Sequence, residues 1–353
     1  MKISIIGAGN GGQAMAGHFA LLGHEITLYN RNLNKLKPIL KKNEIHLSEK
    51  INGIGKIKKI TNDIKCAIKN SELIMIVTTA NAHKELAIKI APYVKENQIF
   101  VLNPGRTLGA MEFSKNLYSI CKKRVYIAEA QSLIYACRII KQGEVRIVGV
   151  KDNVLLSAYP KEDTKYVIEK LNNIFKCFKI AKNILETSLE NIGAILHPPV
   201  IIFNANTIER GELLYFYNDI SPTLVDFIME LDKERLKIGK AFGLNLLSVS
   251  DWISFAYNNI KGDTFYEKIK NNPAYYKILA PKTLKSRLLL EDVSTGILPL
   301  IDLGKLANVQ TPIMNSILKI SNILLGIDFR KDGRTLESMN LQKLNIKKLN
   351  DIL

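Results

Sequence analysis

The first thirty residues constrain the fold of this chain more than any other stretch. A short apolar run ends at Ile6, a glycine-rich turn follows, and a helix of small residues leads into a second strand from Glu25 to Tyr29. In such a unit the first glycine permits a tight turn, the second lets the backbone approach a pyrophosphate, and the third allows helix and strand to pack closely. The N–H groups at the helix N-terminus would face the phosphates.

This strand, turn, helix and strand context predicts a dinucleotide-binding domain rather than an ordinary glycine-rich loop. We expect the whole turn to contact the cofactor. Its residues are Gly7, Ala8, Gly9, Asn10, Gly11 and Gly12.

The end of the second strand bears on which dinucleotide is bound. A carboxylate there would bind the ribose 2′-OH of NAD, whereas an arginine accommodates the 2′-phosphate of NADP. This chain has Asn30 and Arg31. A guanidinium can form two parallel hydrogen bonds to a phosphate, so we expect NADP, with NAD as the alternative. The competing interpretation is that Arg31 only solvates the strand end.

Alternating strands and helices continue after this unit. Leu73–Val77 and Ile99–Leu102 are continuous apolar runs, and the segment 83–94 between them has helical spacing. This pattern predicts βαβ units and a parallel sheet, whose ligands bind beyond the carboxyl ends of the strands. Three turns are expected there, at residues 78–80, 103–106 and 129–132. From these turns we assign Thr78, Thr79 and Arg106 to the cofactor site.

The character of the chain changes near residue 185. Beyond it, apolar spacing is helical over residues 189–207, 222–242, 247–260 and 306–325. We therefore predict two domains, a parallel-sheet dinucleotide-binding domain over 1–185 and a helical domain over 186–353. A length of 353 residues suits two such domains, each with its own core.

Composition excludes several classes of protein. The formal charge of +17 comes from lysines scattered singly, without the basic helix or aromatic platform of a nucleic-acid-binding protein. No apolar run approaches the ~18 residues of a membrane span, and no signal peptide is expected, so the chain should be cytoplasmic. The cysteines lack CxxC spacing, and no two histidines have metal-ligand spacing, so we expect no metal. A positive field would instead attract anionic cofactors and carboxylate substrates.

Candidate catalytic residues lie in the helical half. His197 precedes Pro198 and Pro199 in an apolar helix, and Arg287 and Asp292 lie five residues apart further on. In one interpretation Asp292 orients His197 as proton donor and acceptor while Arg287 binds a substrate carboxylate. In the other, His197 is a core histidine and Arg287 pairs with Glu291 or Asp292 structurally. The residue chemistry alone leaves both open.

Longer blocks of the chain resemble the octopine/opine dehydrogenases, which include the N-(1-carboxyethyl)-norvaline-type enzymes. The resemblance begins at the glycine turn and extends through both halves. The other blocks that carry it are Asn103–Thr107, Tyr135–Cys137, His197–Pro199, Asp232–Arg235, Asn272–Tyr275, Arg287–Pro299 and Gly333–Glu337.

This resemblance implies a Rossmann domain followed by a helical domain like that of 6-phosphogluconate-type dehydrogenases. It also implies that NAD(P)H drives the reductive joining of an amino acid amine to a 2-oxo acid such as pyruvate. His197, Arg287 and Asp292 would be the acid/base, carboxylate-binding and orienting residues. Ser132 and Cys137 would line the substrate side, and we expect a monomer or homodimer.

The sequence differs from the family pattern at positions that concern the amino-acid partner. Arg106 stands where octopine-type enzymes can carry Gln, and Ser132 where they can carry Thr. Two other functions stay open: a reductase like ketopantoate reductase or glycerol-3-phosphate dehydrogenase, and a non-catalytic NADP-binding regulatory module. If Asp292 stabilises the imidazolium of His197, we expect the pKa of His197 to be raised.

Overall fold

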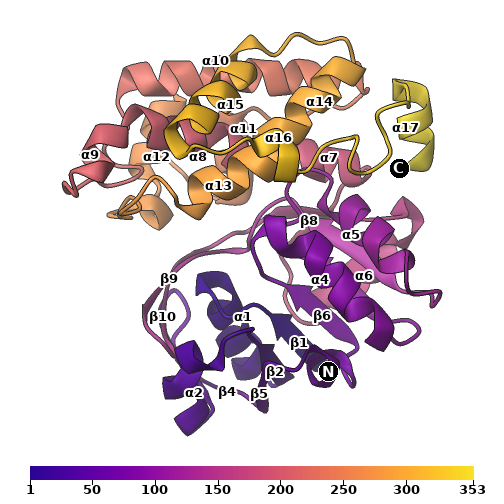
Figure 1. The fold of residues 1–353 in the computed structure, drawn as a ribbon. Coiled ribbons are helices and arrows are strands. Elements are labelled where there is room, and N and C mark those ends of the chain that lie inside the picture. Colours follow the sequence, from indigo (N-terminus) through magenta and orange to yellow (C-terminus); the bar gives the residue numbers. More distant parts are fainter. The chain divides into compact units, whose positions relative to one another are not determined.

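The computed structural model describes residues 1–353, and the chain forms two compact units. The first comprises Met1–Gly105 and Gly109–Ile184, and the second comprises Arg106–Leu108 and Leu185–Leu353. The first unit is α/β, and all regular elements of the second are helical (Figure 1). This pairing of fold classes was predicted. The sequence did not predict that residues 106–108 belong to the helical unit, because three residues leave no trace in the apolar periodicity.

The first unit is built on an eight-stranded sheet with the strand order β12-β11-β8-β7-β6-β1-β2-β5. Its strands are β1 (Lys2–Ile6), β2 (Glu25–Tyr29), β5 (Lys59–Thr61), β6 (Leu73–Ile76), β7 (Ile99–Leu102), β8 (Tyr126–Ala130), β11 (Val154–Ala158) and β12 (Phe178–Ile180). Every residue of β6 and β7 is buried, as expected for parallel strands covered on both faces.

The central strands are parallel and end in register. Ile6 lies opposite both Tyr29 and Ile76, and Ile76 lies opposite Leu102. The strand order reverses at β1, with β2 on one side and β6 on the other, and ligands of such sheets bind beside this reversal. Only β11 runs against its inner neighbour β8.

A second sheet contains β4 (Gly53–Lys56), β3 (Glu44–Glu49), β10 (Glu144–Val150) and β9 (Tyr135–Lys141), in that order. It packs against α1 (Asn10–Leu21), whose other side contributes to the core of the large sheet. The contact is close because it lacks side chains: a Cβ on Gly55 would lie 2.3 Å from the carbonyl oxygen of Gly17.

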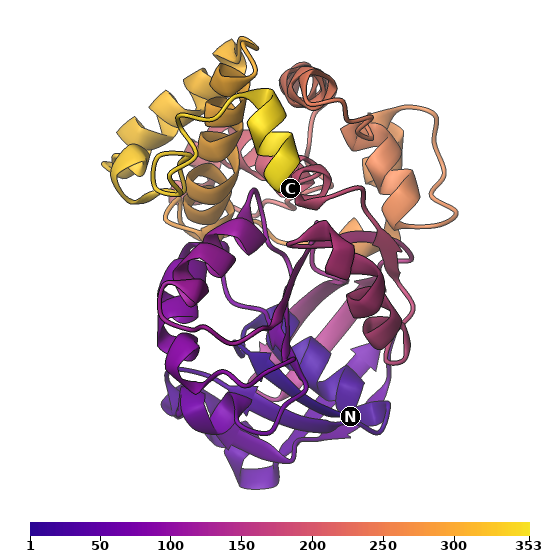
Figure 2. The ribbon, with the colours of Figure 1, turned by 90° about the vertical axis from the view of Figure 1, so that its right-hand side faces the viewer.

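Helices cover both faces of the large sheet. On one face lie α3 (Ile64–Ile68), α4 (His83–Ile90) and α5 (Gly109–Tyr118), and on the other lie α1 and α6 (Thr164–Asn172). Figure 2 shows α4 and α5 stacked along one side of the strands, with α6 on the opposite side. The remaining elements are α2 (Lys37–Lys42) and the short 3₁₀ turns η1 (Leu33–Leu36), η2 (Ala80–Ala82), η3 (Ala91–Tyr93) and η4 (Lys161–Asp163).

The second unit is a helical assembly around α8 and α10. Its elements are α7 (Ile184–Leu189), α8 (Ile192–Phe203), α9 (Ala205–Glu209), α10 (Pro222–Ala241), α11 (Val249–Ala256), α12 (Phe265–Asn271), η5 (Pro273–Tyr275), α13 (Arg287–Asp292), the π-helical turn η6 (Val293–Ile297), α14 (Leu298–Leu306), α15 (Pro312–Leu325), α16 (Phe329–Asp332) and α17 (Ile346–Ile352). None of the helices is both long and apolar enough to span a bilayer.

The helix predicted over residues 306–325 starts later in the structure, after a turn over residues 307–311. Leu306 ends α14, Asn308 has a positive φ of 56°, and α15 starts at Pro312. A proline lacks the N–H that would continue a helix and disfavours helical backbone in the preceding residue. The apolar spacing continues across this turn and therefore does not reveal the break that Pro312 imposes.

A buried ionic cluster supports the helical core. The Arg235 guanidinium is fully buried, with Nε 2.7 Å from Asp232 Oδ1 and Nη1 3.4 Å from Glu190 Oε2. The two carboxylates also accept N–H bonds from Leu247 and Val249. Because every charge has a partner, this block of the sequence has a structural role.

Candidate functional site

The glycine turn has the geometry that a dinucleotide requires. Gly7 has a φ of +109°, a conformation that favours glycine, and a Cβ on Gly12 would lie only 1.8 Å from the carbonyl oxygen of Gly7. A Cβ on Gly9 would meet no atom within 4 Å. Gly7 and Gly12 are therefore required by the turn itself, whereas Gly9 faces open space at the start of α1.

That open space fits a pyrophosphate. Gly9 is the N-cap of α1, no acidic side chain lies in the first turn, and the first N–H groups of a helix have no partner within it. Asn10 accepts the Ile139 N–H at 2.8 Å and so ties the turn to β9, while Gln13 donates to the Ala8 carbonyl at 2.8 Å. The turn is thus held in place by its neighbours, with its N–H groups available to an anion.

The end of β2 presents a cation to the same side. Arg31 is exposed and forms none of the ion pairs in the structure, and Asn30 donates to the Asn32 carbonyl at 2.8 Å. No carboxylate occupies the two positions after β2. Lys89 Nζ lies 3.3 Å from the Tyr29 hydroxyl and adds a second positive charge near the strand end.

Buried polar atoms without partners collect where the parallel strands end. Thr78 Oγ1 follows β6, both amide atoms of Asn103 follow β7, and Ser132 Oγ follows β8. Thr79 is exposed. Unpaired buried polar groups are costly, and their grouping at one sheet edge is typical of a ligand-binding edge. The sequence indicated these turns but did not single out Asn103.

Cys137 is not at this edge. It lies on β9, is 2% exposed and belongs to the apolar core that α1 forms with the two sheets. The expectation that Cys137 lines the substrate side therefore does not fit its position, because alternation along β9 directs it into the core.

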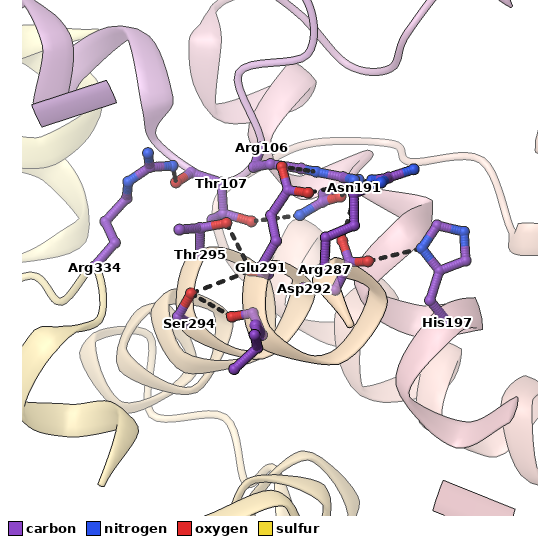
Figure 3. A network of polar contacts seen from close by, with 11 residues as sticks. Arg106, Thr107, Asn191, His197, Arg287, Glu291, Asp292, Ser294, Thr295 and Arg334 are labelled. Carbon is purple, nitrogen blue, oxygen red and sulfur yellow. Dashed lines mark hydrogen bonds and ion pairs between the residues drawn. The ribbon is translucent and has the colours of Figure 1, made fainter. Parts of the chain in front are cut away.

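In the helical unit, His197 and Asp292 form a close pair (Figure 3). His197 Nδ1 lies 2.7 Å from Asp292 Oδ2. Asp292 is fully buried at the end of α13, whereas the His197 side chain is 14% exposed, and its ring meets the edge of Phe216 at 5.6 Å between centroids. A buried carboxylate that holds one ring nitrogen leaves the other nitrogen for chemistry.

Arg287 lies at the start of the same short helix. Its Nη1 is 3.2 Å from Glu291 Oε2, and its side chain is 51% exposed while that of Glu291 is 3% exposed. The guanidinium is therefore held at one end by a buried carboxylate and open to solvent elsewhere. The sequence brought His197, Arg287 and Asp292 together correctly, and it offered Glu291 only as a structural partner.

Arg106 is part of this cluster. Its Nη1 lies 3.2 Å from Asp292 Oδ1 and 3.1 Å from Asn191 Oδ1, and its Nε lies 3.4 Å from Glu291 Oε1. The sequence assigned Arg106 to the cofactor on the grounds that it follows β7. Its guanidinium is instead engaged by residues of the helical unit, because the main chain crosses into that unit at residues 106–108.

Burial lowers the pKa of His197 below its ordinary value, because the imidazolium loses solvation. Asp292 acts in the opposite direction, while Arg106 and Arg287 lower the pKa further. The expectation that the pKa of His197 is raised is therefore wrong, since it considered Asp292 alone. Burial raises the pKa of Asp292, but Arg106, His197 and Arg287 together bring it below the usual range, so Asp292 stays ionised.

No group of three or more His, Cys, Asp or Glu side chains in the structure is arranged to hold a metal ion. The polar cluster pairs carboxylates with guanidinium groups and an imidazole. Groups of these types can transfer protons and bind anions.

Comparisons with known proteins identify the family of this chain. Residues 180–325 match the family described as NAD/NADP octopine/nopaline dehydrogenase, alpha-helical domain, and residues 2–112 match the N-terminus of NAD-dependent glycerol-3-phosphate dehydrogenase. An opine dehydrogenase of Arthrobacter sp. (strain 1C) is 35% identical over 343 residues, which cover 97% of this chain and 95% of that protein. The chain belongs to the opine dehydrogenase family. It is thus an NAD(P)-dependent oxidoreductase of the class that acts on CH–NH bonds.

Other relatives span the whole chain. Vitopine synthase of Allorhizobium ampelinum is 27% identical and covers 100% of this chain, with 99% of its own length matched. Octopine dehydrogenase in complex with NADH and agmatine has a TM-score of 0.79 at 20% identity, covering 99% of this chain and 97% of its own. Yersinopine dehydrogenase with NADP⁺ bound has a TM-score of 0.70 at 13% identity, covering 100% and 97%. These structures share the fold of a Rossmann domain with a helical domain.

Proposed function

We propose that this protein is an NAD(P)H-dependent opine dehydrogenase, which reversibly joins the amine of an amino acid to the carbonyl carbon of a 2-oxo acid. The observation that carries the proposal is the buried His197–Asp292 pair, 2.7 Å apart, beside the half-exposed guanidinium of Arg287. Membership of the opine dehydrogenase family supports it. Octopine dehydrogenase, a relative of known structure, was solved with NADH and agmatine, arginine or pyruvate.

His197 would move the proton that the condensation requires. When the amine attacks the ketone, the carbonyl oxygen must leave as water, and an imidazolium can supply the proton. When bound, the reduced nicotinamide supplies the hydride that reduces the resulting imine. In the reverse direction neutral His197 takes up a proton as water adds to the imine. Asp292 would keep the ring oriented through both directions, because it holds Nδ1 and leaves Nε2 for the substrate.

Arg287 would bind a substrate carboxylate. A guanidinium presents parallel N–H groups that match a carboxylate, and Arg287 is held on one side by Glu291 while half of its surface is open. Binding an anion at Arg287 would also offset a charge that lowers the pKa of His197. Loading of the acid substrate would thereby favour the protonated imidazole that the condensation consumes.

For the cofactor, the glycine turn would hold the pyrophosphate, and Thr78, Thr79 and Ser132 lie on or beside the strand ends toward which a dinucleotide extends. We propose NADPH as the preferred form, because Arg31 is exposed, unpaired and free to meet a 2′-phosphate. Losing one charge-assisted contact to phosphate costs ~1.5–3 kcal/mol, or about tenfold to over a hundredfold in affinity. Titrating the protein with NADPH and NADH tests this preference, and an equal or lower Kd for NADH would contradict it.

The test of the function is an NADPH-oxidation screen with pyruvate and other 2-oxo acids, each with and without a panel of amino acids. Product should appear only when both substrates are present. Oxidation with an oxo acid alone would favour a simple reductase of the ketopantoate type. Tight NADPH binding with no turnover under any combination would favour a regulatory module. We further propose that the enzyme acts in the cytoplasm on free amino acids, as a monomer or homodimer.

A further inference from the structure

Arg106 is delivered to the catalytic cluster by a segment whose main chain is fixed. The Thr107 N–H donates to the Thr295 carbonyl at 3.1 Å, Arg334 Nη1 donates to the Thr107 carbonyl at 2.7 Å, and the Leu108 N–H donates to Ser188 Oγ at 2.8 Å. Contacts from η6, from Arg334 and from α7 thus anchor two successive residues, Thr107 and Leu108, directly after Arg106. The position of Arg106 is therefore set by the fold rather than by its own ion pairs.

Asp292 is shared between two partners, one for each oxygen. Oδ2 is 2.7 Å from His197 Nδ1 as a hydrogen bond, and Oδ1 is 3.2 Å from Arg106 Nη1 as an ion pair without hydrogen-bond geometry. Asp292 is fully buried, so solvent does not screen either interaction. In Figure 3, Asp292 lies between His197 on its right and Arg106 above it.

The first turn of α8 is shaped to admit this guanidinium. A Cβ on Gly193 would lie 2.4 Å from Arg106 Nη1, 3.2 Å from Asp292 Oδ1 and 3.3 Å from His197 Cε1. Glycine within a helix is less favourable than alanine. A glycine at this point is explained by the space that Arg106 needs next to the pair.

The charged groups that act on His197 are few. They are Asp292, Arg106 and Arg287, with Glu291 pairing both arginines. The aromatic segment beside the ring contributes Phe216, whose neighbour Tyr217 acts on Arg106. The other charged side chains on the helices packed against α8 are engaged elsewhere or exposed. Asp232 pairs with Arg235, and Glu234 accepts from Ile313 and Met314. The exposed ones are Glu209, Asp226, Glu230, Lys233, Lys237, Lys240, Asp251 and Lys319.

We infer that Arg106 is a positioning residue for the proton transfer: by holding one oxygen of Asp292, it limits the negative charge that this carboxylate presents to His197. The inference rests on the proposed function only in treating His197 as the acid and base. Together with burial, Arg106 therefore favours the neutral form of His197 when no substrate is bound.

The test is an NMR titration of the His197 ring in wild type and in three variants, Arg106→Gln, Arg106→Lys and Arg330→Gln. The ring signal is assigned as the one that disappears in His197→Ala. Arg330 pairs with Asp302 in the same unit and is 40% exposed, so it controls for loss of one positive charge. Arg106→Gln should raise the pKa of His197 by roughly 1 unit, the size expected of a neighbouring charge. Arg106→Lys and Arg330→Gln should leave it unchanged. The pH at half-maximal kcat/KM for opine oxidation should move upward in Arg106→Gln alone.

An unchanged pKa of His197 in Arg106→Gln would overturn the inference. If that variant also binds NADPH more weakly, Arg106 would be a cofactor-binding residue instead. If Arg106→Gln does not fold, Gly193→Ala displaces the guanidinium without removing its charge, and it should move the titration in the same direction. An unchanged pKa in that variant would also overturn it. The titration needs no substrate, so its outcome is separate from the NADPH-oxidation screen that tests the function.

Discussion

Each unit has a cluster of buried polar groups at its candidate site, but the groups of the two clusters are satisfied differently. At the sheet edge of the first unit, Thr78, Asn103 and Ser132 carry buried polar atoms without partners. In the helical unit, His197, Asp292, Glu291 and both arginines pair with one another. A ligand at the sheet edge would supply missing hydrogen bonds, whereas a ligand at the helical cluster must join or replace existing pairs.

The two regions therefore depend on different features of the protein, one on backbone geometry and the other on side-chain charge. The glycine turn and strand ends depend on backbone geometry, which an anion completes. The helical cluster depends on side-chain charges whose balance changes when a carboxylate arrives. Changes at the first region should therefore affect cofactor binding, and changes at the second should affect turnover and its pH dependence.

The largest effect is expected at the charge-balanced region. His197→Ala should lower kcat by ~10²–10⁴, the usual contribution of general acid–base catalysis, while NADPH still binds with its normal Kd. His46→Ala is a matched control, because His46 is a partly exposed histidine on β3 of the other unit. Steady-state kinetics and a cofactor titration on both variants decide the matter. Retained activity, or joint loss of folding and cofactor binding, would make His197 a core residue.

A second change separates substrate binding from stability within that region. Arg287→Lys should raise the KM for the oxo acid by about tenfold to over a hundredfold, because a charged hydrogen-bond pair contributes ~1.5–3 kcal/mol. The melting temperature should hardly change, since exposed ion pairs contribute only ~0–1 kcal/mol. Arg330→Lys serves as the control for an exposed arginine of the same unit. A large fall in melting temperature with an unchanged KM would assign Arg287 a structural role.

A third change addresses the backbone-dependent region. Gly9→Ala adds a methyl group into space that is open in the free protein, so its stability should match wild type. The same methyl group would meet a bound pyrophosphate, and the Kd for NADPH should rise about tenfold or more, or ~1.4 kcal/mol. Gly12→Ala is the contrasting variant, because its Cβ would strike the Gly7 carbonyl and destabilise the turn itself. Unchanged cofactor affinity in a folded Gly9→Ala protein would place the pyrophosphate elsewhere.

The smallest effect concerns pH and the core of the first unit. Burial lowers the pKa of His18 to about 4, and its Nδ1 lies 2.7 Å from the Tyr135 hydroxyl. Because the unfolded state binds the proton more tightly, the contribution of His18 to stability is full above pH ~6.5 and is lost as the pH falls toward 4. Melting temperatures of wild type and His18→Gln, measured across this range, should converge toward the acid end. Parallel curves would show that His18 does not titrate during unfolding.

Local patterns predicted much of this protein. The glycine turn depends on residues within one short segment, and the apolar runs of β6 and β7 indicated the parallel sheet directly. A histidine in an apolar helix and a nearby arginine and carboxylate made His197, Arg287 and Asp292 candidates, and the family resemblance gave them their expected roles. Asn103 was not singled out and Glu291 was named only as a structural partner, since their importance depends on which atoms lack or share partners. The break before Pro312 was visible in the sequence but was outweighed by apolar spacing.

The sequence by itself determined the fold class, the family and the chemical types at the site, because periodicity, glycine spacing and residue chemistry are local properties. Only the tertiary structure decided which charges meet. In the structure Arg106 pairs with Asp292, although the sequence assigned it to the cofactor. Cys137 lies in the core, and the pKa of His197 is lowered where a raised pKa was expected. The physical reason is that burial and electrostatic interaction depend on distances in space. Residues separated by 186 positions, such as Arg106 and Asp292, become neighbours only when the chain has folded.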